Sequence, residues 1–344
     1  MSPFDYTLDE KGYAVPFDAN KVVDDTARAH VAAFQEQEVI LDFEVPKEPQ
    51  QFYESFGLLL HPRLKDPVTK RPILIKELAP YQVRWWKEKG DVATPKSNKV
   101  GLTTTSGLEL FQSRLLPEEA GFDALWVAQT ARMANEHILN LKNQIRWSKR
   151  YSKFLITRPD IELFREEKSK ASVIYVANPY DRKRPSRIIG IGGSESLAYS
   201  WKYINRIHGA DISLLKAKEQ KAFFAGLYSR VANTQGPIKF ESIPNGQQGE
   251  FWNIISKSRD KRADVDNEEL AEDPEGRAGD FKIWDIAYTE AISAGVITEE
   301  FIEKQKRRLG DLLFSQLFEC NFLPPGNQWY RAEWIKSEGY GIGW

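Results

Sequence analysis

The stretch Lys96-Ser97-Asn98-Lys99-Val100-Gly101-Leu102-Thr103 lies between a predicted turn at Thr94-Pro95 and a predicted helix start at Thr104. A loop that leads into a helix N-terminus presents backbone N–H groups to an anion, and this arrangement suits a polyphosphate. We therefore interpret the stretch as a phosphate loop with an unusual sequence. The alternative interpretation is an ordinary basic turn that caps a helix.

The loop departs from the usual motif at the position of its cation. The usual phosphate loop ends in Gly-Lys-Ser/Thr. Gly101 and Thr103 occupy the first and last of these positions, but Leu102 stands where the lysine should be. The nearest cations are Lys96, at the start of the loop, and Lys99, inside it. Because a folded loop can bring Lys96 back over the phosphates, the chemistry of phosphate binding is retained.

Composition and charge exclude several classes of protein. The 344 residues leave room for two or three domains, or for one large domain with accessory parts. Apolar residues make up 41% of the chain, so a sizeable core can form and disorder of the whole chain is excluded. Lys plus Arg total 48 against 49 Asp plus Glu, so any contact with nucleic acid must come from a local basic face.

The single cysteine and the distribution of apolar residues indicate the compartment. Cys320 cannot form an intrachain disulfide, which fits a reducing compartment. Residues 1–5 show no basic and apolar leader, and no uncharged apolar run approaches the roughly 20 residues of a membrane span. We expect a soluble intracellular protein with no membrane partner.

Compact apolar runs alternate with helical patterns after the loop. Residues 124–128 and 171–177 are typical of buried parallel strands, and residues 131–149 have the apolar spacing of a helix. This alternation predicts an α/β fold with a largely parallel sheet, whose ligands gather at the carboxyl ends of the strands. The expected regions are an N-terminal arm with helices (1–75), the core (76–280) and a small C-terminal lid or linker subdomain (281–344).

Four residues outside the loop are candidates for a nucleotide site. Tyr81 can stack on a purine, and the amide of Gln82 can pair with its donor and acceptor edge; the alternative is an amphipathic helix whose aromatics belong to the core. Asp211 follows a predicted strand, and Ser242 begins a turn after another predicted strand. The alternatives for these two are an ordinary turn residue and a strand terminator.

The order of these elements resembles the ATPase region of the large terminase subunits, the DNA-packaging motors of tailed viruses. The resemblance covers roughly residues 75–325. Tyr81-Gln82 is similar to the adenine-binding motif, and residues 96–103 are similar to a variant phosphate loop with its lysine at the front. Ser242-Ile243-Pro244-Asn245-Gly246 resembles the coupling motif, and residues 314–322 resemble the segment that ends the ATPase region.

The resemblance implies a P-loop NTPase of the ASCE/RecA-like type, with a mainly parallel sheet flanked by helices, that hydrolyses ATP with Mg²⁺. Lys96 and loop N–H groups then neutralise the β- and γ-phosphates, and Thr103 and Asp211 serve the metal. The implied nucleotide-binding residues are Tyr81, Gln82, Lys96, Ser97, Asn98, Lys99, Val100, Gly101, Leu102, Thr103 and Thr104. Ser242 and Asn245 are implied to sense the γ-phosphate and to couple its loss to DNA movement.

The chain departs from the family pattern at its catalytic acids. The family's aspartate–glutamate pair is represented only by Ala210-Asp211. The resemblance implies that Asp211 orients or deprotonates the attacking water, and Glu195 is the alternative catalytic carboxylate. An arginine finger is also expected: Lys99 occupies the in-loop cation position, and Arg132 or an arginine of a neighbouring subunit can serve instead.

The resemblance also implies partners and a location. They are double-stranded DNA, a portal protein and a small terminase subunit, in the cytoplasm of the virus's host. We expect a homo-oligomeric ring, a pentamer, on the portal and a monomer in isolation. The family carries a C-terminal nuclease, and Trp344 comes too soon for one. No nuclease domain and no nuclease activity are therefore expected of this chain.

Two other functions remain open at the level of the sequence. One is a different nucleic-acid-dependent P-loop ATPase, a helicase or remodeller, although 344 residues leave little space for the second RecA-like domain of that class. The other is a degenerate nucleotide-binding or structural subunit, which Leu102 and the weak acid motif suggest.

Overall fold

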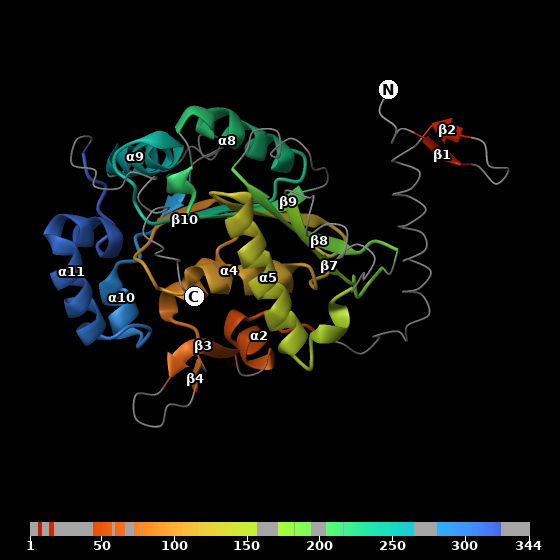
Figure 1. Cartoon of the computed structure of the whole chain (residues 1–344), viewed down its shortest axis with the longest axis horizontal. Coiled ribbons are helices and arrows are strands. Elements are labelled where there is room, and N and C mark those ends of the chain that lie inside the picture. The colour runs from red at the N-terminus through yellow and green to blue at the C-terminus, as the bar shows by residue number, and fades with distance from the viewer. Residues whose placement is uncertain are drawn as a thin grey trace.

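A seven-stranded sheet forms the centre of the chain in the computed structural model (Figure 1). From edge to edge its strands are β11 (Lys282–Ile283), β5 (Val92–Pro95), β10 (Ile238–Ser242), β9 (Ile204–Ala210), β6 (Asp123–Ala128), β8 (Ser186–Gly192) and β7 (Ala171–Val176). The structure describes residues 6–8, 14–16, 44–56, 59–65, 72–75, 77–156, 171–181, 183–193, 204–215, 217–264 and 281–324.

Neighbouring strands of this sheet run parallel, except that β7 pairs antiparallel with β8 at one edge. Strands β5, β6, β9 and β10 are buried along their whole length, as expected for parallel strands covered on both faces. In the register, Glu241 of β10 lies beside Ala210, and Ser242 lies beside Pro95. The carboxyl ends of β5, β10 and β9 therefore meet at one edge, and the prediction of a mainly parallel sheet is confirmed.

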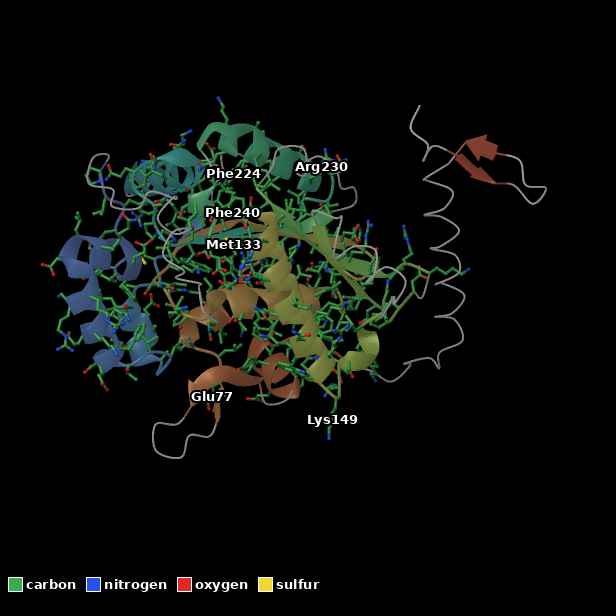
Figure 2. The ribbon with its side chains drawn as sticks, in the orientation of Figure 1. Glu77, Met133, Lys149, Phe224, Arg230 and Phe240 are labelled. Atoms are coloured by element: carbon green, nitrogen blue, oxygen red, sulfur yellow. The ribbon has the colours of Figure 1, made fainter. Side chains whose placement is uncertain are left out.

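Helices cover both faces of the sheet (Figure 1). One face carries α2 (Pro49–Ser55), α3 (Pro80–Lys87), α4 (Leu102–Ser113) and α5 (Ala131–Trp147), and the other carries α8 (Ala217–Val231) and α9 (Gly249–Asp264). Phe224 of α8 and Phe240 of β10, both labelled in Figure 2, pack edge to face with ring centroids 5.1 Å apart. Two apolar cores result, one on each face, which confirms the predicted flanking helices.

Helix α5 illustrates how the sequence determines these elements. Its N-cap residue Thr130 accepts a hydrogen bond from the Met133 N–H through its hydroxyl, at 3.2 Å. Ile138, Leu141 and Ile145 recur at helical spacing and are all buried against the sheet. The helix therefore begins at a cap and is held by one apolar face.

The C-terminal part of the described chain adds a strand and two helices. Strand β11 joins the edge of the central sheet, so the segment expected as a lid starts within the core. Helices α10 (Tyr288–Ser293) and α11 (Glu299–Phe318) share an apolar cluster of their own that includes Phe314 and Phe318. Gly310 interrupts α11 with non-helical angles. None of the described helices has the length and apolar character needed to cross a membrane.

The described part of residues 1–75 contains four strands and one helix, α2. Strand β1 (Tyr6–Leu8) pairs antiparallel with β2 (Ala14–Pro16), and β3 (Leu59–Lys65) pairs antiparallel with β4 (Pro72–Ile75). Helix α2 packs into the core through Phe52, which lies 5.8 Å from Trp86 of α3, centroid to centroid. This part of the region thus contributes directly to the core on the α4 side.

A buried network of charged side chains fixes α4 to the sheet. Glu109 of α4 accepts hydrogen bonds from Lys239 of β10 at 2.6 Å and from Arg206 of β9 at 2.7 Å. Arg206 also donates to Glu119 at 2.6 Å, and Arg114 donates to the same carboxylate at 2.6 Å. Buried charges require such partners. The network therefore determines where α4, and the loop that enters it, lies relative to β9 and β10.

Candidate phosphate-binding site

The predicted phosphate loop lies at the carboxyl ends of β5, β10 and β9. Its first half is held by backbone hydrogen bonds to three other segments. The Lys96 N–H donates to the Ser242 carbonyl at 2.9 Å, and the Ser97 N–H donates to the Ile286 carbonyl at 2.7 Å. The Asn98 N–H donates to the Leu317 carbonyl of α11 at 2.9 Å. These N–H groups are therefore committed to the protein, so backbone donors to an anion would come from the second half of the loop.

The second half of the loop turns into the N-terminus of α4. Lys99 and Gly101 have positive φ angles of 66° and 73°, and Gly101 is the N-cap residue without a side-chain cap. The first N–H groups of a helix have no partners within that helix. At Leu102, Thr103 and Thr104 they lie at the positive end of the α4 dipole, which is a general anion-binding arrangement. The predicted helix start is thus placed to receive a phosphate.

Lys96 is buried, and three oxygens from three different elements surround its ammonium. Nζ lies 3.3 Å from Asp211 Oδ1, 3.4 Å from Thr103 Oγ1 and 3.9 Å from Glu241 Oε2. Burial lowers the pKa of Lys96, but the charges of Asp211 and Glu241 outweigh burial and hold its pKa above the usual value. The lysine at the front of the loop is therefore a cation that points into the site.

Asp211 follows β9 directly and adopts a left-handed conformation with φ 52°. Its N–H donates to the Glu241 carbonyl at 2.8 Å, which continues the pairing of β9 with β10 by one residue. The left-handed region is one that Asp adopts more readily than most residues. The structure thus brings together three of the residues that the sequence singled out: Lys96, Thr103 and Asp211.

Sequence reasoning missed Glu241, which lies in the middle of this group. Its side chain is fully buried, and its Oε1 lies 3.3 Å from His208 Nε2. Burial raises the pKa of Glu241, but the charge of Lys96, the hydrogen bond from His208 and the Thr103 hydroxyl lower it, and the net effect is a lowered pKa. The sequence shows only that Lys239 and Glu241 alternate with Ile238 and Phe240 along this segment, a weak signal that two charges lie in a strand.

Tyr81 and Gln82 contact the loop from α3. The Tyr81 hydroxyl donates to the Val100 carbonyl at 2.8 Å, and Gln82 Nε2 donates to the same carbonyl at 3.3 Å. Gln82 Oε1 accepts from the Ala79 N–H at 2.9 Å. Both side chains are buried, and burial followed by the charge of Glu290 raises the pKa of Tyr81. Their observed contacts support the loop; contact with an adenine stays a prediction.

The predicted coupling segment is tied to the turn that follows Asp211. Ser242 donates to the Ser213 hydroxyl at 2.7 Å and accepts from the Ser213 N–H at 3.0 Å. Ser213 donates to the Ile243 carbonyl at 2.6 Å, and Asn245 Nδ2 donates to the Ser213 carbonyl at 3.3 Å. The short helix η2 (Ile212–Leu214) is thus the physical link between Asp211 and the coupling segment.

The remaining candidates have less defined places. Lys99 is exposed, and the side chain of Arg132 is 88% exposed and pairs with Glu136 at 3.1 Å. Val100 and Leu102 are buried in an apolar cluster with Tyr81, which anchors the loop rather than exposing these side chains. Glu195 lies outside the described residues.

The groups that could bind a divalent cation at this site are a hydroxyl and a carboxylate. No group of three or more His, Cys, Asp and Glu side chains in the described ranges is arranged to hold a metal. Mg²⁺ is commonly held by only one or two carboxylates together with waters and substrate phosphates. The Thr103 hydroxyl and the Asp211 carboxylate, both near Lys96 Nζ, fit that requirement.

Comparisons with known proteins concern the fold. The sequence matches no protein-family model and no curated protein. The structure superposes on the large-terminase ATPase domain of Thermus phage P74-26 with a TM-score of 0.53 and 11% identity, covering 82% of this chain and 100% of that domain. The chain has the fold of a large-terminase ATPase domain. The large terminase of bacteriophage HK97 superposes with a TM-score of 0.51 and 10% identity, over 76% of this chain. The chain spans about half the length of such complete large terminases, 53% for the HK97 protein.

Replacement of Gly101 by alanine tests how α3 supports the loop. A Cβ at Gly101 would lie 2.9 Å from Gln82 Nε2, and φ is 73°. Gly101→Ala should lower the free energy of unfolding by about 1–2 kcal/mol for the backbone conformation, plus about 0.5–1.5 kcal/mol for the displaced Gln82 hydrogen bond. Urea unfolding followed by tryptophan fluorescence measures the sum.

Gly295→Ala is the matched control for this substitution. Gly295 has φ 70°, and a Cβ there meets nothing within 4 Å. It therefore measures the backbone cost alone. An equal loss of stability in the two variants would show that Gln82 does not support the loop.

Proposed function

We propose that this chain is the ATP-hydrolysing motor of viral DNA packaging, the ATPase part of a large terminase. One observation carries the proposal: the buried Lys96 ammonium lies beside Thr103 and Asp211 at the uncapped N-terminus of α4. Phosphoryl transfer requires a cation, a hydroxyl, a carboxylate and backbone N–H donors such as those of the first turn of a helix. The terminase fold, which the chain shares at low identity, supports the choice among P-loop ATPases.

The residues of the site suggest how ATP is held. The N–H groups of Leu102, Thr103 and Thr104 donate to the phosphates, and Lys96 turns from Asp211 to the β- and γ-phosphate oxygens. The exchange gives Lys96 the larger negative charge of a polyphosphate in place of the carboxylates of Asp211 and Glu241. Thr103 and Asp211 would hold Mg²⁺, which would neutralise the charge that develops on the transferred phosphoryl group.

The attacking water requires an acceptor near the γ-phosphate. Asp211 is our choice, because its carboxylate lies at the carboxyl end of β9 and 3.3 Å from Lys96 Nζ. Aspartate is one methylene shorter than glutamate, so its carboxylate extends less far toward the attacking water. Glu195, outside the described residues, is the alternative acid.

Coupling is proposed to use the two connections that leave the loop. Through Ser242 and Ser213, a displacement at Asp211 would reach Asn245, four residues before α9. Through the bond from the Asn98 N–H to the Leu317 carbonyl, a displacement of the loop reaches α11. Loss of the γ-phosphate would thus move both the coupling segment and the C-terminal helices, which makes them the candidates for DNA movement.

The proposed partners follow from the same assignment. They are double-stranded DNA, a portal protein and a small terminase subunit, in the host cytoplasm. The working assembly is proposed to be a homo-oligomeric ring, a pentamer, that forms on the portal, and the free chain is proposed to be a monomer. Arg132 is a candidate arginine finger, because its exposed side chain on α5 can reach a neighbouring subunit.

A steady-state ATPase assay of the purified chain, with and without linear double-stranded DNA, tests this function. We expect Mg²⁺-dependent hydrolysis that DNA accelerates. Hydrolysis without DNA stimulation would contradict the packaging assignment but would still support ATPase activity. Nucleotide binding without any hydrolysis would favour the degenerate structural subunit, which Leu102 at the usual lysine position suggests.

The two loop lysines should differ in their effect on hydrolysis. Lys96→Ala removes the buried cation from the phosphates and should lower kcat by about 10²-fold or more. Lys99→Ala removes an exposed cation and should retain more activity. Both rates are compared at saturating ATP, with thermal unfolding as the control for folding. Equal losses, or a larger loss at Lys99, would reverse the assignment of the two lysines.

Asp211→Asn should keep ATP binding and stop turnover, because an amide can hydrogen-bond to water but cannot accept its proton. We expect a drop in kcat of about 10²-fold or more, with an unchanged affinity for a fluorescent ATP analogue measured without metal. Glu195→Gln is the paired variant and should retain turnover. The opposite pattern would transfer the role of catalytic carboxylate to Glu195.

A further inference from the structure

We propose that Glu241 is a divalent-cation ligand, and that Thr103, Asp211 and Glu241 together form a cation site whose oxygens surround the Lys96 ammonium. The inference deepens the proposed ATPase site and rests on it for the metal that accompanies the nucleotide. It assigns a residue that neither the sequence motifs nor the fold indicates.

The first support is the arrangement of oxygens around Lys96 Nζ. Asp211 comes from the end of β9, Glu241 from β10 and Thr103 from α4, and all three place an oxygen within 3.9 Å of the same nitrogen. The side chains of Asp211 and Glu241 are 10% and 0% exposed. Hard oxygen ligands that converge on one cation are what Mg²⁺ requires.

The second support is that the contacts of these oxygens with the protein are long. The contacts from Lys96 to these oxygens are long, because Nζ lies 3.3 Å from Asp211 Oδ1 and 3.9 Å from Glu241 Oε2. The neighbouring buried acids differ: Glu109 and Glu119 accept several short bonds from Lys239, Arg206 and Arg114 in the charge network. An ion pair with a single lysine leaves the two carboxylates with excess negative charge and with lone pairs to offer.

The third support is the way Glu241 is oriented. Its Oε1 lies 3.3 Å from His208 Nε2. The His208 ring in turn packs on Trp126, with centroids 4.8 Å apart, and on Trp85, with centroids 5.9 Å apart. Such partners fix the orientation of ligands in metal sites. His208 thus holds one oxygen of Glu241 and directs the other toward Lys96.

Charge balance explains why the site changes its occupant. When Lys96 moves to the phosphates, two buried carboxylates lose the single positive charge that partly offsets them. Buried unpaired carboxylates are costly, so a second cation must take the place of the ammonium. A divalent ion there balances the two negative charges of Asp211 and Glu241. The Lys96 ammonium and the divalent ion thus compete for the same oxygens.

The test uses Mn²⁺ alone as the probe, measured by electron paramagnetic resonance without nucleotide. Lys96→Met removes the competing ammonium and should tighten Mn²⁺ binding by about tenfold or more over the parent chain, because a positive charge within 4 Å of the ion is lost. Adding Glu241→Gln to Lys96→Met should weaken binding by about 10- to 100-fold. Adding Glu303→Gln, on the exposed side of α11, should leave it unchanged.

Thermal unfolding shows whether the Lys96→Met variant folds. If it does not, a second measurement tests the proposal without that variant. In the otherwise unchanged chain, Glu241→Gln should weaken Mn²⁺ binding in the presence of ADP by about tenfold or more, and should not weaken ADP affinity without metal. Mn²⁺ affinity that is insensitive to Glu241→Gln in these measurements overturns the inference. Mn²⁺ binding that depends on Glu241 in a chain that hydrolyses no ATP would support the site and contradict only the proposed function.

Discussion

The burial of the Lys96 ammonium is the constraint on which the rest of the site depends. A buried cation is stable only beside opposite charge. The strand order β5-β10-β9 supplies that charge, because it places Glu241 and Asp211 next to the loop that leaves β5. The apolar cores and the charge network of Glu109 then fix α4, whose first turn provides Thr103. The order of the strands, the position of α4 and the geometry of the loop therefore all determine the surroundings of Lys96 Nζ.

The loop is also held from its outer side, by α3 and α11. Tyr81 holds the Val100 carbonyl from α3, and the Asn98 N–H is bonded to α11. Ser242 accepts the Lys96 N–H through its carbonyl and contacts Ser213 through its hydroxyl. The same residue thus connects the loop, the turn after Asp211 and the coupling segment. The loop is therefore hydrogen-bonded both to α11 and to the strand end that contacts the turn after Asp211.

Much of this arrangement could be predicted from sequence, because it depends on local patterns. The apolar runs predicted a mainly parallel sheet, and the loop and Asp211 were recognisable at the ends of strands. Glu241 was missed because its partners Lys96 and His208 come together only through strand order, which periodicity does not contain. The observed contacts of Gln82 are with the backbone of the loop and of α3, a geometry that a motif cannot reveal. The joining of β11 to the sheet edge likewise depends on long-range pairing.

The central claim is that the loop between β5 and α4 binds polyphosphate through Lys96. A crystal structure of the chain with Mg²⁺ and a non-hydrolysable ATP analogue tests it most directly. The account predicts phosphates against the N–H groups of Leu102, Thr103 and Thr104, with Lys96 Nζ moved from Asp211 onto a phosphate oxygen. An analogue bound elsewhere, or bound at the loop with Lys96 still paired to Asp211 and Glu241, would contradict it.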